Sequence, residues 1–157
     1  MCIRDRQFGG TEFAKNNSSV YADRAYHPGI DLGAPRGTKI KAPLSGTVRA
    51  IGDTGLVNGC SSWGKWILID HANGLSTFYA HQDVISVEPG DKVKTGEVIG
   101  YTGNTGYSTG PRLQFTVYAT AAVEVRKFSE IKTKTSCGPA STPFLSLIHI
   151  SEPTRPY

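Results

Sequence analysis

Apolar and polar residues alternate over short runs along the middle of the chain, a pattern typical of half-buried β-strands. The two clearest runs are residues 65–70 and 75–81, and the Asn73-Gly74 pair between them is a preferred hairpin turn. No run has the length and period of a helix. Further runs of the same kind are residues 38–42, 46–51, 92–94, 98–101, 112–118 and 123–128. The pattern therefore predicts an all-β domain built on an antiparallel sheet.

Composition supports this prediction and bounds the architecture. Glycine occurs 18 times and proline 9 times against a single methionine, which favours short strands joined by tight turns over a helical bundle. A chain of 157 residues with 38% hydrophobic and 19% charged residues has room for one folded domain. No apolar run approaches the roughly 20 residues of a membrane helix, so we expect no membrane span in this chain.

The net charge of +4 raises the possibility of nucleic-acid binding. Such binding would need lysine and arginine gathered into a patch with stacking aromatic residues. Here the basic residues are spread along the chain, with one mild cluster at Lys127, Lys132 and Lys134. We therefore expect no nucleic-acid partner, although a mildly basic surface would suit another anionic polymer.

The two ends of the chain differ from the middle in pattern. Residues 1–6 and 146–157 lack both the glycine turns and the alternation, and they resemble translated adapter or vector sequence. We expect a non-native leader at 1–6, one β domain at 7–145 and a non-native tail at 146–157. The leader is too short and too charged to be a signal peptide, and we expect the natural protein to continue beyond both ends.

The three cysteines, Cys2, Cys60 and Cys137, form no Cys-x-x-Cys motif, which argues against a zinc knuckle or a thioredoxin-like site. A disulfide between Cys60 and Cys137 is possible if the chain works outside the reducing cytosol.

His27 and Asp31 are the first candidate metal ligands. On a straight strand two residues four positions apart lie about 13 Å from each other, whereas two ligands of one zinc ion must each come within about 2.0–2.2 Å of it. Pro28-Gly29 between them can form the type II turn that bends the chain. A surface turn with two polar neighbours would show the same spacing.

His81 ends an aromatic strand and is a candidate for proton transfer or for binding an oxyanion. It could equally be a partly buried histidine whose ring is satisfied by the backbone. Strict alternation puts Thr77, Tyr79 and His81 on one face of that strand. His71, beside Asp70 at the hairpin entry, is expected to be a solvated turn residue.

The strand at residues 112–118 alternates cleanly. Arg112, Gln114 and Thr116 share one face, and Leu113, Phe115 and Val117 are expected to pack on the other. A glycine-rich approach, YTGNTGYSTG, precedes this strand.

Taken in order, these motifs resemble a known enzyme family. HPGID at 27–31, GKWILIDHANGLSTFYAH at 64–81, VEPGDKVKTGEVIGYTGNTGYSTGP at 87–111 and the strand that follows are similar to the lysostaphin-type (LytM-like) zinc metallopeptidases, which cut peptide cross-links in bacterial peptidoglycan. The resemblance covers residues 8–144. It implies an antiparallel β-sheet with glycine-rich loops around a groove, and an extracytoplasmic protein in the periplasm, at the cell surface or secreted.

The resemblance also implies residue roles. His27 and Asp31 match the first two zinc ligands, and His81 matches a catalytic histidine. The family's closing motif is His-x-His, which supplies a second catalytic histidine and the third zinc ligand. These two positions are Arg112 and Gln114 here.

That departure weakens the expected zinc site. An amide oxygen is a poorer zinc donor than imidazole, and a guanidinium can neither bind the metal nor act as a base. We therefore expect weak zinc affinity, impaired hydrolysis by zinc-activated water, and a pairing of Arg112 with Asp31 that partly replaces the metal. Were zinc held, His81 would assist proton transfer, and Arg112 could serve only to stabilise an oxyanion.

Two alternatives remain open at this point. The chain could be a degenerate, non-catalytic domain that binds the cell wall or activates another wall hydrolase, with peptidoglycan peptide or that hydrolase as its partner and a monomer as its state. The stretches APLSGTVRAIG and VEPGDKVKTGEVIGYTG are also similar to biotinyl and lipoyl carrier domains, but the lysine motif that carries the cofactor in those domains is absent.

Overall fold

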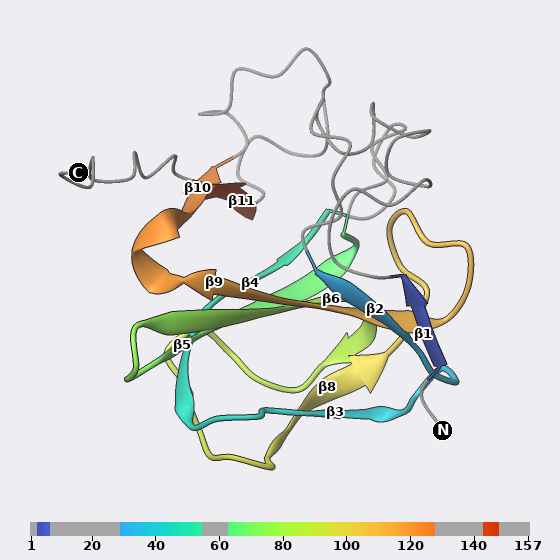
Figure 1. The fold of residues 1–157 in the computed structure, drawn as a ribbon, viewed down its shortest axis with the longest axis horizontal. Coiled ribbons are helices and arrows are strands. Elements are labelled where there is room, and N and C mark those ends of the chain that lie inside the picture. Colours follow the sequence, from blue (N-terminus) through green and yellow to red (C-terminus); the bar gives the residue numbers. More distant parts are fainter. Residues whose placement is uncertain (1–2, 7–28, 55–62, 128–142, 148–157) are drawn as a thin grey trace, which may run out of the picture.

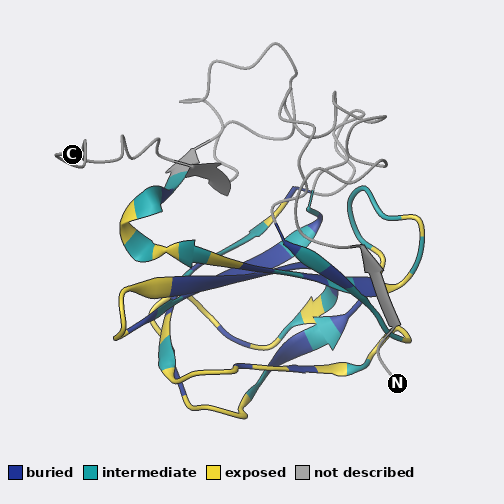
Figure 2. Ribbon diagram, viewed as in Figure 1, coloured by how far each residue is buried: buried dark blue, intermediate teal, exposed yellow. Residues whose placement is uncertain are grey.

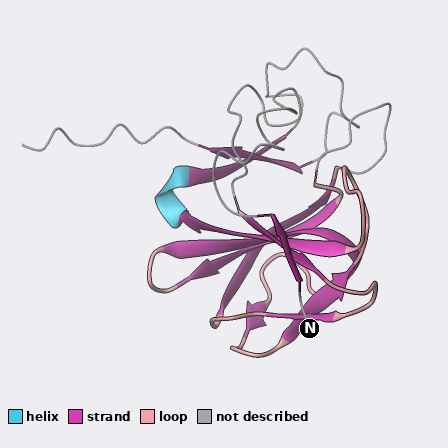
Figure 3. Cartoon of the chain, turned by 45° about the vertical axis from the view of Figure 1, so that its right-hand side comes forward, coloured by secondary structure: helices cyan, strands magenta, loops and turns pink. Residues whose placement is uncertain are grey.

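The computed structural model of the 157-residue chain describes residues 3–6, 29–54, 63–127 and 143–147. Within these ranges strands make up almost the whole fold, and the one helical element is a short 3₁₀ turn, η1 (Thr120–Ala122) (Figure 3). The all-β prediction is confirmed. No helix of the described residues is long and apolar enough to cross a membrane.

One nine-stranded sheet and one two-stranded ribbon make up the architecture, and every pairing is antiparallel (Figure 1). The main path of the large sheet runs β1-β2-β9-β6-β5-β4-β7, and β8 pairs with both β3 and β6. The ribbon joins β10 and β11. The strand bounds are β1 Ile3–Arg6, β2 Ile30–Gly33, β3 Lys39–Lys41, β4 Gly46–Asp53, β5 Lys65–His71, β6 Leu75–Ile85, β7 Lys92–Val93, β8 Val98–Thr102, β9 Arg112–Ala119, β10 Val123–Lys127 and β11 Pro143–Leu147.

The structure confirms each of the eight predicted strands to within a few residues at either end, as well as the Asn73-Gly74 hairpin. Gly74 adopts a φ of 77°, which the turn requires, and Leu75 N donates to Asn73 Oδ1 at 3.1 Å. The expectation that Val117 packs with Leu113 and Phe115 was wrong, since Val117 is 50% exposed. The sequence analysis did not predict β1, β2 or β11. Strand β2 has only four residues, too few for alternation to show.

The central strands are buried on both faces because a hydrophobic cluster lies on each side of the sheet (Figure 2). Tyr79 of β6 lies opposite Phe115 of β9, and the two rings contact each other on the face that β3 and β8 cover. Phe78 points to the other face. There it packs in a cluster whose buried members are Ala50, Trp66, Leu68, Phe78, Ala80 and Val123. Burial on both faces explains the nearly continuous apolar run in β5.

His71 is buried, so the expectation of a solvated turn residue was wrong. Strand β5 extends to this residue, and His71 pairs there with Gly46 of β4. Its Nδ1 lies 3.0 Å from Ser45 O and its Nε2 lies 2.8 Å from Thr77 Oγ1, which in turn lies 2.8 Å from Tyr79 Oη. A Cβ at Gly46 would come within 2.7 Å of His71 Nδ1, so only glycine leaves room for the imidazole.

Because of Tyr79, the free energy of unfolding should fall at alkaline pH. Burial raises the pKa of Tyr79 to about 12, and the hydrogen bond with Thr77 opposes this shift. An unfolded tyrosine ionises near pH 10. The folded state therefore holds its proton more tightly, and the contribution of Tyr79 is complete below pH 10 and is lost as the pH rises from about 10 to about 12.

We expect urea unfolding to show a loss on the order of 3 kcal/mol across this pH range that is missing from Tyr79→Phe. Other tyrosines and lysines titrate in both proteins and cancel in the comparison. Equal losses in the two proteins would contradict this assignment.

Candidate active site

Strand register places two candidate residues, Asp31 and Gln114, on one face of the sheet. Asp31 of β2 lies directly opposite Gln114 of β9, and Gln114 lies opposite Ala80 of β6. Because directly opposed residues of antiparallel strands point to the same side, Asp31 and Gln114 share the face of Ala80 and Phe78. Asp31 is completely buried.

A β-bulge brings His81 to that face. The β5–β6 register passes from Lys65 opposite Gln82 to Ile67 opposite Tyr79, so Ala80 and His81 together occupy the position across from Trp66. His81 adopts a φ of 64°, the left-handed region, and its N donates to Trp63 O at 2.9 Å.

Strict alternation would have sent His81 to the Tyr79 face, as the sequence analysis expected. The bulge inserts one residue and redirects the side chain. The predicted face of His81 was therefore wrong, and the residue joins the candidate site for a reason that alternation could not reveal.

The neutral His81 ring has a defined tautomer. Its Nδ1 lies 2.8 Å from Thr105 O, and a carbonyl can only accept, so Nδ1 carries the proton. Burial, reinforced by the charge of Arg112, lowers the pKa of His81 to about 4. At neutral pH Nε2 is therefore an acceptor, and Arg112 Nη2 lies 3.2 Å from it.

Gln114 also lies against the His81 ring. The distance between Gln114 Oε1 and His81 Nε2 is 3.2 Å. Because Nδ1 carries the proton of the neutral ring, Nε2 has no hydrogen to donate to this oxygen. The oxygen and nitrogen of an amide have nearly the same shape, so the Gln114 amide can meet the ring with either end.

Arg112 is the centre of the site. Its Nε lies 3.3 Å from Asp31 Oδ2, and the two side chains are 5% and 0% exposed. Its Nη2 also donates to Tyr107 O at 2.9 Å. The predicted pairing of Arg112 with Asp31 is confirmed.

The loop at residues 103–111 supplies two backbone acceptors, and the sequence analysis missed both. Thr105 O faces His81 and Tyr107 O faces Arg112. Thr105 Oγ1 holds the loop in place, since it donates to Gln82 O at 2.7 Å and accepts from Lys65 N at 3.0 Å. The run of glycines was the available signal, but backbone carbonyl directions cannot be read from residue types.

The described residues of this site do not fit a zinc ion as they stand. The guanidinium of Arg112 lies against the Asp31 carboxylate, and His81 offers Nε2 to that same guanidinium. The Gln114 amide, a weak zinc donor, lies against the His81 ring. Within the part of the chain that the structure describes, no group of three or more His, Cys, Asp or Glu side chains could hold a metal. His27, the remaining expected ligand, and the Cys60–Cys137 pairing lie outside the described residues.

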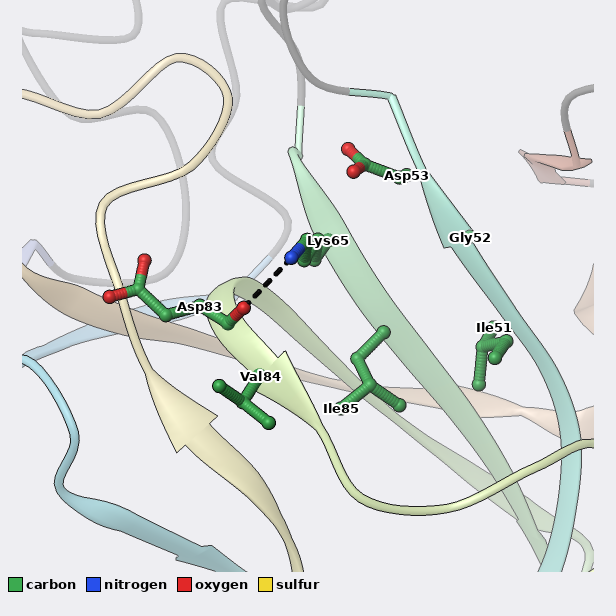
Figure 4. Close-up of a pocket in the computed structure, with 7 residues that line it drawn as sticks. All are labelled: Ile51, Gly52, Asp53, Lys65, Asp83, Val84 and Ile85. Carbon is green, nitrogen blue, oxygen red and sulfur yellow. Dashed lines mark hydrogen bonds between the residues drawn. The ribbon is translucent and has the colours of Figure 1, made fainter.

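A separate pocket of about 440 Å³ lies beside the site (Figure 4). Lys65 Nζ donates to Asp83 O at 2.9 Å across it, and Asp83 Oδ2 pairs with Arg36 Nε at 2.7 Å. The pocket is lined by Ile51, Gly52, Asp53, Lys65, Asp83, Val84 and Ile85. Neither His81 nor Arg112 reaches it.

This chain is similar to several known proteins. The sequence profile of peptidase family M23 matches residues 25–126. The DD-carboxypeptidase/endopeptidase Mpg of Neisseria meningitidis is 43% identical over 89 residues, which cover 57% of this chain and 19% of that protein. The peptidoglycan DD-endopeptidase ShyA of Vibrio cholerae is 37% identical over 101 residues, covering 62% and 24%. The chain thus spans about a fifth to a quarter of the length of these two relatives.

Among solved structures, the catalytic domain of the antimicrobial peptidase lysostaphin from Staphylococcus simulans has the same fold. It superposes with a TM-score of 0.62 and 29% sequence identity, over 76% of this chain and 81% of that domain. The antiparallel architecture expected from the sequence resemblance is therefore confirmed.

The left-handed backbone at His81 predicts an inverted order of two variants. A residue with a Cβ pays about 1–2 kcal/mol for this conformation, whereas glycine does not, although glycine loses about 0.5–1 kcal/mol through its more flexible unfolded state. We expect His81→Gly to be more stable than His81→Ala by about 0.5–1 kcal/mol in urea unfolding. Ala80→Gly is the control and should destabilise. A His81→Ala protein more stable than His81→Gly would refute the left-handed assignment.

Proposed function

Because this chain belongs to peptidase family M23, we propose that it is a peptidoglycan-directed domain of that family whose peptide hydrolysis is impaired. The substrate class is supported by the similarity to Mpg, a DD-carboxypeptidase/endopeptidase, and to ShyA, a peptidoglycan DD-endopeptidase, and by the lysostaphin-like fold. The observation that carries the impairment is the buried contact of 3.3 Å between Arg112 Nε and Asp31 Oδ2.

The side chains of the site explain why hydrolysis would be slow. Peptide hydrolysis needs a base to activate water and a group to stabilise the oxyanion. The lone pair of His81 Nε2 already accepts from Arg112, so it is not free to take a proton from water. The charge of Arg112 is turned toward Asp31, which reduces what it can offer an oxyanion.

Recognition of an extended peptide is compatible with the same geometry. The glycine-rich loop at 103–111 is held against the sheet through Thr105, and Tyr107 lies on this loop partly exposed. We propose that the Tyr107 side chain lines a groove for peptidoglycan peptide, in a monomeric domain that works outside the cytoplasm.

The second candidate function is a non-catalytic one. A domain that binds the wall, or that activates another wall hydrolase, would keep the fold and the loop while losing the metal donors. The Arg112–Asp31 ion pair favours this reading, since it satisfies a buried carboxylate without a metal.

The first test is turnover of purified peptidoglycan with and without added zinc. We expect this chain to release soluble peptide at less than about one hundredth of the rate of the lysostaphin catalytic domain, because the His81 Nε2 lone pair that would activate water already accepts from Arg112. Zinc should not raise this rate. Sedimentation of the protein with insoluble peptidoglycan measures binding separately. Comparable, zinc-dependent turnover would contradict the impairment, and absence from the pellet would contradict the substrate class.

The second test restores the donors. We expect the double variant Arg112→His/Gln114→His to gain zinc-dependent hydrolysis at least tenfold above the parent, because imidazole replaces both the obstructing cation and the weak donor. Arg36→His, at an exposed arginine, is the matched control. No gain in the double variant would show that the defect does not lie at these two positions.

A further inference from the structure

Arg112 joins three separate segments of the chain at one buried point. Its Nε lies 3.3 Å from Asp31 Oδ2 in β2, and its Nη2 lies 3.2 Å from His81 Nε2 in β6 and 2.9 Å from Tyr107 O in the loop at 103–111. The Arg112 side chain is 5% exposed. Contacts of this kind fix the relative positions of β2, β6 and the loop.

We propose that Arg112 is the resident cation of this site, which holds Asp31, His81 and the loop at 103–111 in place without a metal ion. The inference deepens the proposed function and rests on it for the identity of the site. It concerns what stabilises the native state, so it is measured without any hydrolysis assay.

The charge balance of the site supports the proposal. A fully buried carboxylate is costly unless an opposite charge or strong donors compensate it. Asp31 is 0% exposed, and Arg112 brings a full positive charge against it. The two opposite charges of this ion pair compensate each other.

The shape of guanidinium matters as well as its charge. It is planar and presents donors along two edges. In Arg112 the Nε atom lies at ion-pair distance from the carboxylate, and Nη2 donates to both His81 Nε2 and Tyr107 O. A lysine ammonium carries its donors on one atom, so it could not lie against the carboxylate and reach both acceptors in the same way.

The same geometry makes guanidinium and a dication mutually exclusive. A metal bound through Asp31 would lie next to a buried cation and would have to displace it from the interior. A displaced Arg112 would in turn leave Tyr107 O and His81 Nε2 without this donor. Metal binding would thus dismantle the contacts that hold the loop.

The first test uses the full chain at pH 7 in thermal unfolding and calorimetry. We expect the melting temperature to differ by less than about 1 °C between excess EDTA and equimolar zinc chloride, and calorimetry to show no zinc binding below about 10 µM. A zinc-induced rise of several degrees, or submicromolar binding, would overturn the proposal. Because this test does not measure turnover, it can fail while impaired hydrolysis stands, and the reverse also holds.

Two variants compare the stabilisation given by the buried Arg112 with that given by an exposed ion pair. We expect Arg112→Met to lower the melting temperature by about 10 °C or more, because it leaves a buried carboxylate without its cation. Arg36→Met is the matched control. Arg36 pairs with Asp83 at 2.7 Å but is 66% exposed, so a change of no more than about 2 °C is expected.

The double variant Asp31→Asn/Arg112→Met identifies the cause. It removes both charges, and we expect it to recover at least half of the loss seen in Arg112→Met. Arg112→Lys should retain less than half of the melting temperature that Arg112→Met loses, because an ammonium group lacks the spread-out donors of guanidinium. If Arg112→Met does not fold, folding of the double variant still supports the proposal. Equal effects of Arg112→Met and Arg36→Met, or no recovery in the double variant, would overturn it.

Discussion

A buried ion pair between neighbouring strands is the constraint on which this site depends. Asp31 is inaccessible to solvent, and Arg112 lies against it at 3.3 Å. Burying two charges costs desolvation free energy, and their attraction offsets this cost only when the partners are close and the remaining donors are satisfied. Arg112 lies close to Asp31, and its Nη2 also donates to His81 Nε2 and Tyr107 O.

The sheet gives this pair its precision. Three adjacent strands, β2, β9 and β6, set the row that runs from Asp31 through Gln114 to Ala80. The bulge at Ala80 and His81 then adds one residue and turns an imidazole into that row. Bulges recur beside functional sites because they redirect a side chain without breaking the rest of the ladder.

Membership of peptidase family M23 fixes the fold but not the chemistry. Function resides in particular side chains placed on a scaffold, and the same scaffold tolerates their replacement. Here the chain keeps the sheet and the glycine-rich loop, while Arg112 and Gln114 stand where the sequence resemblance implies histidines. The result is a buried cluster built around the ion pair of Arg112 and Asp31.

The amino-acid sequence by itself determined eight of the eleven described strands, the main hairpin and the shared face of Arg112 and Gln114, because alternation and turn residues are local signals. The family resemblance placed Arg112 near Asp31, and residue chemistry then predicted that the two side chains pair, since a fixed cation attracts a carboxylate. The burial of His71 and the face of His81 were decided only by tertiary structure. His71 is covered because β5 continues one residue further and meets a glycine across the sheet. His81 changes face because its left-handed backbone interrupts the alternation of side chains along β6. The length of a strand pairing and the position of a bulge both depend on the neighbouring strands, so the residues of one strand do not determine them.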